Sequence, residues 1–81
     1  MKTSYKTRGT CSRKIDIEVS DGTIKNVNFS GGCDGNLKGI AALAEGMKTS
    51  DAIEKLEGIT CGFKKTSCPD QLAKALREMQ N

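Results

Sequence analysis

Four cysteines and no histidine are spread along a chain of only 81 residues. A chain this short is expected to form one domain, residues 1–81, and to bury only about 60% of its unfolded surface. Chains of this size often need a metal ion, disulfides or a partner subunit to stay folded. The missing histidine excludes a Ser–His–Asp triad, a Cys–His nucleophile and every zinc site that uses imidazole. We therefore expect the chemistry of this chain to depend on sulfur.

The charge of the chain is mildly positive. Thirteen basic and ten acidic residues give a formal charge of +3, which is weaker than the basic footprint of a dedicated nucleic-acid-binding protein. The basic residues 1–8 are not followed by the apolar stretch of a signal peptide, and no apolar run reaches the roughly 20 residues of a membrane span. We therefore expect a cytoplasmic protein without a membrane partner, whose reduced thiols serve metal or redox chemistry.

The first third of the chain has the alternation of a small antiparallel sheet. Apolar side chains alternate with charged ones, as in a strand with one buried face; these apolar residues are Ile15, Ile17 and Val19. An Asp-Gly turn in residues 20–23 leads to a second predicted strand from Ile24 to Phe29. Residues 3–7, in which Thr and Tyr alternate with polar residues, are the candidate for a third strand.

The rest of the chain is predicted to be helical. Apolar residues recur at helical spacing from Leu37 to Ala44. A short helix capped by Thr49 or Ser50 ends at Gly58, and a last helix begins at Pro69. We therefore expect an α+β fold, in which a small antiparallel sheet of two or three strands is followed by two or three helices packed on one of its faces.

All four cysteines are predicted to lie at the ends of these elements, outside the apolar stripes. They are Cys11, Cys33, Cys61 and Cys68. If Pro69 is the first helical residue, Cys68 is the capping residue, where unpaired N–H groups and the helix dipole favour a thiolate. Glycines around Cys33 let backbone N–H groups approach its sulfur, although a tight turn explains the same glycines. Burial as small apolar side chains is the alternative role for all four.

The spacing of the cysteines does not by itself identify a metal site. Zinc modules typically use paired C-x2-C knuckles, which this sequence lacks. A site with four thiolates would therefore have to be assembled by the fold. We predict such a site, with zinc as the preferred ion, because a d10 ion suits a purely structural role, and an iron–sulfur cluster as the alternative.

Two segments resemble the TSCPD domain family. They are Gly31–Asn36 (GGCDGN) and Thr66–Ala73 (TSCPDQLA). The resemblance extends over nearly the whole chain and is to the short stand-alone members of the family. The same domain occurs at the C-terminus of adenosylcobalamin-dependent ribonucleotide reductases, where its cysteines are supposed to bind metal or serve the reductase. The resemblance thus implies a metal site and an accessory role in ribonucleotide reduction, in a chain too short to hold the reductase's own catalytic barrel.

A remoter resemblance is to the U-type iron–sulfur assembly scaffolds, which implies their order of strands, Gly-Cys loop and helices. The positions similar to their three cluster cysteines are Cys11, Cys33 and Cys68. Arg13 and Ser67 stand where the scaffolds have Asp and His, and Cys61 has no counterpart as a ligand in most of them. Three thiolates with a labile fourth position favour cluster transfer, whereas four favour a retained metal. The sequence therefore favours the closed site.

Two other functions are alternatives to a metal site. One is thiol redox chemistry that passes electrons to a ribonucleoside-diphosphate reductase, with Cys61 and Cys68 as the dithiol, although C-x6-C is not a recognised redox spacing. The other is binding of nucleotide or nucleic acid by basic residues, namely Lys2, Lys6, Arg8, Arg13, Lys14, Lys64 and Lys65. Solvated surface lysines explain the same residues, and few aromatic side chains are available to stack on bases.

The sequence favours neither nucleic acid as a partner nor catalysis by the chain alone. A ribonucleotide reductase or another protein is the expected partner, and a homo-oligomer is compatible with the sequence. The carboxylates of Asp34, Glu54 and Asp70 are each explained by a turn, an exposed helix position or a first helical turn. Their spacing does not pair them for acid–base chemistry.

Overall fold

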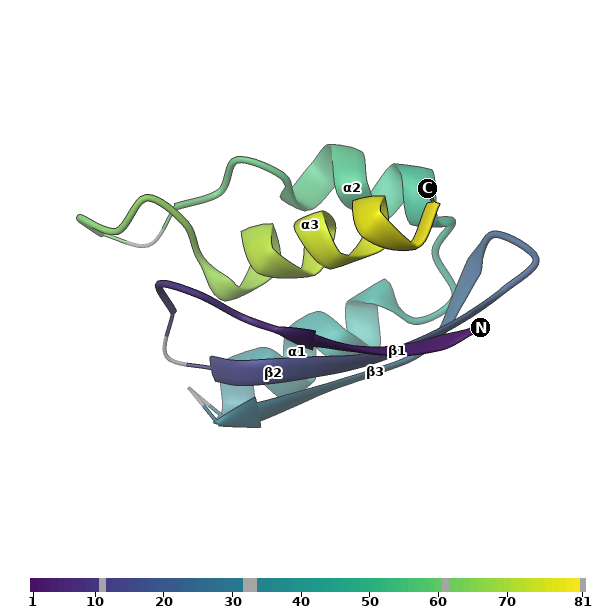
Figure 1. Ribbon diagram of the computed structural model, residues 1–81, viewed down its shortest axis with the longest axis horizontal. Coiled ribbons are helices and arrows are strands. Elements are labelled where there is room, and N and C mark those ends of the chain that lie inside the picture. The colour runs from purple at the N-terminus through teal and green to yellow at the C-terminus, as the bar shows by residue number, and fades with distance from the viewer. Residues whose placement is uncertain (11, 32–33, 61, 81) are drawn as a thin grey trace.

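Three strands are followed by three helices in the part of the chain that the structure describes (Figure 1). The computed structural model describes residues 1–10, 12–31, 34–60 and 62–80. The elements are β1 (Lys2–Lys6), β2 (Ser12–Ser20), β3 (Thr23–Gly31), α1 (Asp34–Ala44), α2 (Thr49–Leu56) and α3 (Cys68–Gln80). Because the strands form one antiparallel sheet, the predicted α+β fold is confirmed, including the third strand near the N-terminus.

The central strand of the sheet is β2, and both β1 and β3 pair with it in antiparallel orientation. The β2–β3 hairpin turns over Asp21 and Gly22, whose φ angles are 54° and 73°. Positive φ at both central residues is the geometry of a type I′ hairpin turn, which matches the right-handed twist of the strands. The predicted Asp-Gly turn is therefore confirmed.

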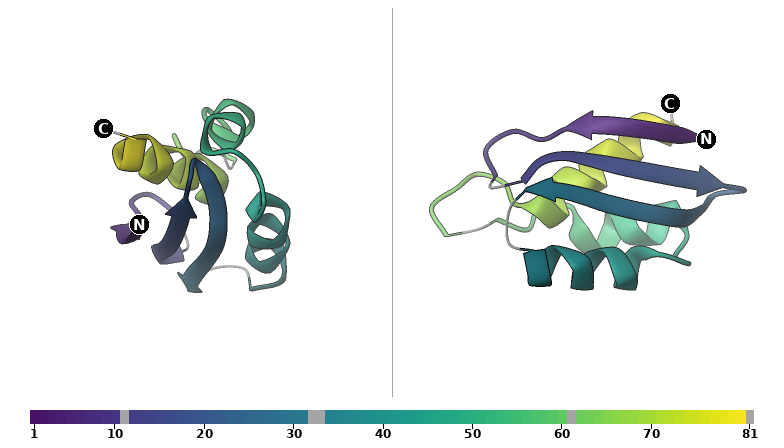
Figure 2. Two further views of the ribbon diagram at one scale, coloured as in Figure 1. Left: turned by 90° about the vertical axis from the view of Figure 1, so that its right-hand side faces the viewer. Right: turned by 90° about the horizontal axis from the view of Figure 1, so that it is seen from below.

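One face of the sheet is buried under the helices and the other face is open (Figure 2). Helix α3 lies over the strands and packs against α2, while α1 packs against β3. The buried face carries the predicted alternating residues Ile15 and Ile17, which are almost fully buried. The helices contribute four alanines together with Ile53, Leu72 and Leu76. The core cluster consists of Ile15, Ile17, Ile24, Val27, Ala41, Ala44, Ala52, Ile53, Leu72, Ala75 and Leu76.

The start of α2 differs from the prediction. We expected Thr49 or Ser50 to cap this helix, but Lys48 occupies the capping position and its side chain makes no capping hydrogen bond. The reason lies outside the helix, because the N–H of Thr49 donates to the carbonyl oxygen of Gly22 at 2.9 Å. The β2–β3 turn thus satisfies one of the unpaired N–H groups that every helix start presents.

Two other boundaries extend further than the sequence pattern indicates. Strand β3 continues beyond Phe29 to Gly31, because Gly31 pairs with Ser12 at the start of β2. Helix α1 begins at Asp34, earlier than the apolar spacing that starts at Leu37. None of the helices in the described part of the chain is long and apolar enough to cross a membrane.

Candidate functional site

Ser67 caps helix α3. Its Oγ atom accepts a hydrogen bond from the backbone N–H of Asp70 at 3.1 Å, and its carbonyl oxygen accepts one from the N–H of Gln71 at 2.8 Å. The helix therefore begins at Cys68 and not at Pro69 as predicted, which makes Cys68 its first residue rather than its cap. The physical reason is that a serine hydroxyl is a strong acceptor for helix N–H groups, whereas a thiol is a weak one.

The same residues hold the chain segment that follows α2. The hydroxyl of Ser67 donates to the carbonyl oxygen of Ile59 at 2.6 Å. The Oδ1 atom of Asp70 accepts a hydrogen bond from the N–H of Gly58 at 2.8 Å, and Oδ2 accepts one from the hydroxyl of Thr66. Capping of α3 and attachment of the α2–α3 segment therefore depend on one set of buried polar side chains.

Asp70 is only 3% exposed, and its surroundings favour the charged carboxylate. Burial raises the pKa of Asp70, but hydrogen bonds from Thr66 and Gly58 and the nearby Lys74 outweigh this effect and hold the pKa below its usual value. The Nζ atom of Lys74 lies 3.3 Å from Oδ2 of Asp70, one turn further along α3. Asp70 is therefore a structural anion, unlike the acids and bases of enzymes, whose pKa values lie near the working pH.

Gln71 connects the start of α3 to the β1–β2 loop. Its Nε2 atom donates to Oγ1 of Thr66 at 2.9 Å, and its Oε1 atom accepts a hydrogen bond from the N–H of Arg8 at 3.1 Å. The next residue, Gly9, has a φ of 73°, and a Cβ atom there would lie 3.2 Å from Cγ2 of Thr66. The positive φ and the close approach of the loop to α3 therefore both favour glycine at this position.

Cys68 is buried, with 7% of its surface exposed, and its sulfur has a polar neighbour. The Sγ atom lies 3.1 Å from Oγ of Ser12, the first residue of β2, and either atom can be the donor. The same Ser12 hydroxyl lies 3.1 Å from Oγ1 of Thr10. The environment of this thiol is therefore more polar than expected for a cysteine that serves only as a small apolar side chain.

The other three predicted ligands, Cys11, Cys33 and Cys61, lie outside the described residues. Described residues one or two positions from each of these cysteines are linked by contacts to the start of α3. Ser12 contacts the sulfur of Cys68, Gly31 pairs with Ser12, and Ile59 bonds to Ser67. Within residues 1–10, 12–31, 34–60 and 62–80, no three cysteine, aspartate or glutamate side chains are grouped so that they could hold a metal ion.

Three buried polar residues of this site had no individual role predicted from the sequence. They are Ser12, Thr66 and Gln71. One signal was available, because Ser67 followed three residues later by an acidic residue is a pattern related to the capping box. By contrast, no sequence pattern connects Ser12 to Cys68, which is 56 residues away.

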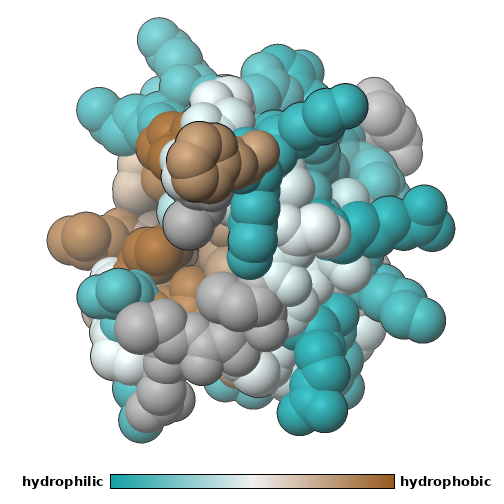
Figure 3. Space-filling view, turned by 90° about the vertical axis from the view of Figure 1, so that its left-hand side faces the viewer, coloured by the Kyte–Doolittle hydropathy of each residue, from teal (hydrophilic) through white to brown (hydrophobic). Residues whose placement is uncertain are grey.

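Apolar side chains gather on the surface at this end of the molecule (Figure 3). Phe63 is fully exposed and Ile59 is 43% exposed, and both belong to the segment between α2 and α3. Two exposed lysines, Lys64 and Lys65, follow Phe63 directly. The surface near the start of α3 is therefore both apolar and positively charged.

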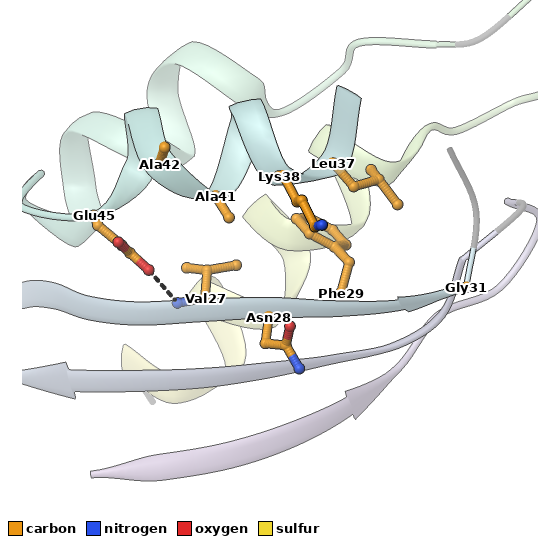
Figure 4. A pocket seen from close by; sticks show the side chains of 9 residues that line it. All are labelled: Val27, Asn28, Phe29, Gly31, Leu37, Lys38, Ala41, Ala42 and Glu45. Atoms are coloured by element: carbon orange, nitrogen blue, oxygen red, sulfur yellow. Dashed lines mark hydrogen bonds between the residues drawn. The ribbon is translucent and has the colours of Figure 1, made fainter. Parts of the chain in front are cut away.

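A groove of about 270 Å³ lies between α1 and β3 (Figure 4). Val27 and Phe29 point toward α1 from β3, while Leu37 and Ala41 line the groove from the helix. Among the described residues that line the groove, Glu45 is the single acidic one, and its Oε2 atom accepts a hydrogen bond from the N–H of Val27 at 3.2 Å. The described lining residues thus do not include the paired carboxylates of an acid–base site.

The family model of the TSCPD domain matches residues 1–80 of the chain. The match includes the capped helix start Thr66–Asp70 and the positions of all four cysteines. No curated protein and no solved structure matches the chain.

Proposed function

Because this chain belongs to the TSCPD domain family, we propose that it is a small metal-binding module. In this proposal one zinc ion is held by four thiolates, and an iron–sulfur cluster is the alternative. The ligands are Cys11, Cys33, Cys61 and Cys68. The observation that carries the proposal is the buried contact between Cys68 Sγ and Ser12 Oγ, because it joins α3 to the strand end next to another cysteine.

The contacts around Cys68 support a site shared by four segments. Ser12 follows Cys11 in sequence, and Gly31, which pairs with Ser12, precedes Cys33 by two residues. Ile59, bonded to the residue before Cys68, precedes Cys61 by two residues. A chain spans up to about 3.6 Å per residue, so its connectivity permits the four thiols to meet.

The chemistry at Cys68 fits a metal ligand. The sulfur belongs to the first residue of α3, where the helix dipole favours the thiolate that zinc requires. The Ser12 hydroxyl, 3.1 Å away, can donate to that thiolate and orient it. Exposed cations of the neighbouring segments, including Arg8 and Lys64, offset the negative charge of a zinc ion with four thiolates. When bound, the ion would supply a crosslink between loops that a small core needs.

The metal content of the protein, purified without chelator, tests this proposal. We expect about one zinc ion per chain by elemental analysis, and reduced retention in each of four Cys→Ser variants but not in Ser50→Ala, an exposed serine of α2. A brown protein with visible absorption would show that the site holds an iron–sulfur cluster instead of zinc. A folded, metal-free chain whose four thiols all react with a thiol reagent would overturn the site.

Thiol redox chemistry is supported less well by the environment of Cys68. Exchange with a disulfide requires an accessible thiolate, whereas the side chain of Cys68 is buried. An accessory role in ribonucleotide reduction stays a prediction from the family resemblance. Its test is whether the chain restores activity to a reductase that lacks its C-terminal domain, and no stimulation would argue against it.

A further inference from the structure

Two lysines face each other across the open face of the sheet. Lys6 of β1 pairs directly with Lys14 of β2, and both side chains are exposed. Seen from below in Figure 2, no helix crosses in front of this face. Like charges directly opposite each other in an antiparallel pair destabilise the sheet. The pair therefore lowers the stability of the chain, an effect that Asp16, 3.9 Å from Nζ of Lys14, offsets in part.

A β-bulge brings a third cation to the same place. The register passes from Ser12 opposite Gly31 to Lys14 opposite Ser30, so that Arg13 is the extra residue on β2. Bulges increase the local twist of a strand and redirect side chains, and they are common next to functional sites. Here both Arg13 and Lys14 are exposed and line one depression.

This depression has a volume of about 520 Å³ and combines cations with hydroxyl groups. Its lining residues are Ser4, Lys6, Arg13, Lys14 and Ser30. Asp16 lies 3.9 Å from Nζ of Lys14 and accepts a hydrogen bond from the Ser4 hydroxyl, whose single donor is therefore occupied. One carboxylate against three cations leaves the depression positive, and the ammonium and guanidinium groups are donors that suit phosphate oxygens.

We propose that this depression binds the di- or triphosphate group of a small molecule. The positive surface is compact, because Asp16 and Glu18 follow Lys14 on the open face of β2. A nucleic-acid strand that continued along this face would meet those carboxylates, whereas a short polyphosphate would not. Among the described residues that line the depression, none is an aromatic residue on which a base could stack. The depression therefore recognises the phosphate groups, with little selectivity for the rest of the molecule to which they are attached.

The proposal has a signature that ordinary solvated lysines would not produce. Replacing Lys6 by Gln removes the repulsion between the lysines and also removes a phosphate contact. The variant Lys6→Gln should therefore unfold about 1–5 °C above the unmodified protein without ligand, yet bind polyphosphate about fivefold more weakly. Arg13→Gln should weaken binding similarly. Lys55→Gln, which removes an exposed lysine of α2, is the matched control and should leave binding unchanged.

Calorimetric titration of the full chain with inorganic tripolyphosphate, at low and high salt, measures these effects. We expect saturable binding that weakens with salt and with Lys6→Gln. Equal weakening by Lys55→Gln, or no saturation, would overturn the proposal. ATP and a single-stranded oligonucleotide are the comparison ligands. Similar affinities for ATP and tripolyphosphate support phosphate recognition. Tighter binding of the oligonucleotide would overturn the proposal and show that this surface binds nucleic acid.

Discussion

The Sγ atom of Cys68 lies 3.1 Å from the Oγ atom of Ser12, so that the first residue of α3 contacts the first residue of β2. Both side chains are buried, and Ser12 also pairs through its backbone with the last residue of β3. One contact thus connects the helical layer to two strands at the end of the molecule where the family motif begins α3.

Replacing Ser12 by Ala tests the role of this hydroxyl in the proposed metal site. The variant loses the donor that orients the Cys68 sulfur, and such supporting groups typically contribute 10- to 100-fold, as rough magnitudes, to metal affinity. We therefore expect weaker zinc retention in competition with a chromogenic chelator. Ser20→Ala, an exposed serine at the other end of β2, is the control. Equal zinc affinity in both variants would show that the Ser12 hydroxyl does not support the metal site.

Replacing Ser67 by Ala should destabilise the fold. The variant loses the capping acceptor for the Asp70 N–H and the hydrogen bond to Ile59. Loss of a serine cap costs about 1–2 kcal/mol of unfolding free energy, which equilibrium unfolding in urea measures. The matched control is Ser50→Ala, which changes an exposed serine in the first turn of α2 and is expected to cause no such loss. A Ser67→Ala protein as stable as the control would contradict the capping role.

Asp70 should make the stability of the chain depend on acidic pH. Its pKa in the folded protein lies below the ordinary value of 3.8, so its contribution is fully present above that pH. The contribution is lost as the pH falls through the folded-state pKa, because protonation then favours the unfolded chain. Asp70→Asn should lower the unfolding free energy at neutral pH by about 1.5–3 kcal/mol, as expected for hydrogen bonds to a charged group.

Urea unfolding at a series of pH values checks this dependence. The difference in stability between the unmodified protein and Asp70→Asn should shrink below about pH 4. Asp51→Asn, which changes an exposed acid in the first turn of α2, should not reproduce the effect. A difference that stays constant down to the lowest pH would show that Asp70 contributes through shape and not through charge.

Gly9 and Gly22 allow backbone strain to be separated from side-chain crowding. Both have a φ of 73°, but a Cβ at position 9 would lie 3.2 Å from Thr66, whereas at position 22 it meets nothing within 4 Å. Gly22→Ala should therefore carry only the cost of the left-handed backbone, about 1–2 kcal/mol. Gly9→Ala should cost more, since Thr66 must also shift. Thermal unfolding of the two variants measures the difference, and equal losses would contradict the close approach of the loop.

Local patterns predicted much of the fold correctly. Alternating residues such as Ile15 and Ile17 indicated a strand with one buried face, and Asp21-Gly22 indicated its turn. These predictions succeeded because the information lies within a few neighbouring residues. The start of α2 was predicted wrongly for the opposite reason. Its first N–H bonds to Gly22, a contact between distant segments that no local pattern contains.

The candidate site was predictable in part. The position of Cys68 at a helix start followed from Pro69, although the capping role belongs to Ser67. The partner of Cys68 was not predictable, because Ser12 comes close to it only through the packing of α3 on the sheet. The bulge at Arg13 was equally hidden, since it depends on how β2 pairs with β3. The roles of Cys11, Cys33 and Cys61 as metal ligands stay predictions.

The polar contacts at the start of α3 have a consequence for specificity as well as for stability. Four of the seven helical residues in the core cluster are alanines, and the two large ones of α3, Leu72 and Leu76, are both leucines, so apolar packing alone discriminates weakly against a helix displaced by one turn, about 5.4 Å. Directional bonds from Thr66, Ser67 and Gln71 do not tolerate such a displacement. Among the described residues, no buried side-chain nitrogen or oxygen lacks a partner. A slipped helix would leave several without one, so these few polar groups select a single alignment from those that the apolar core alone would accept.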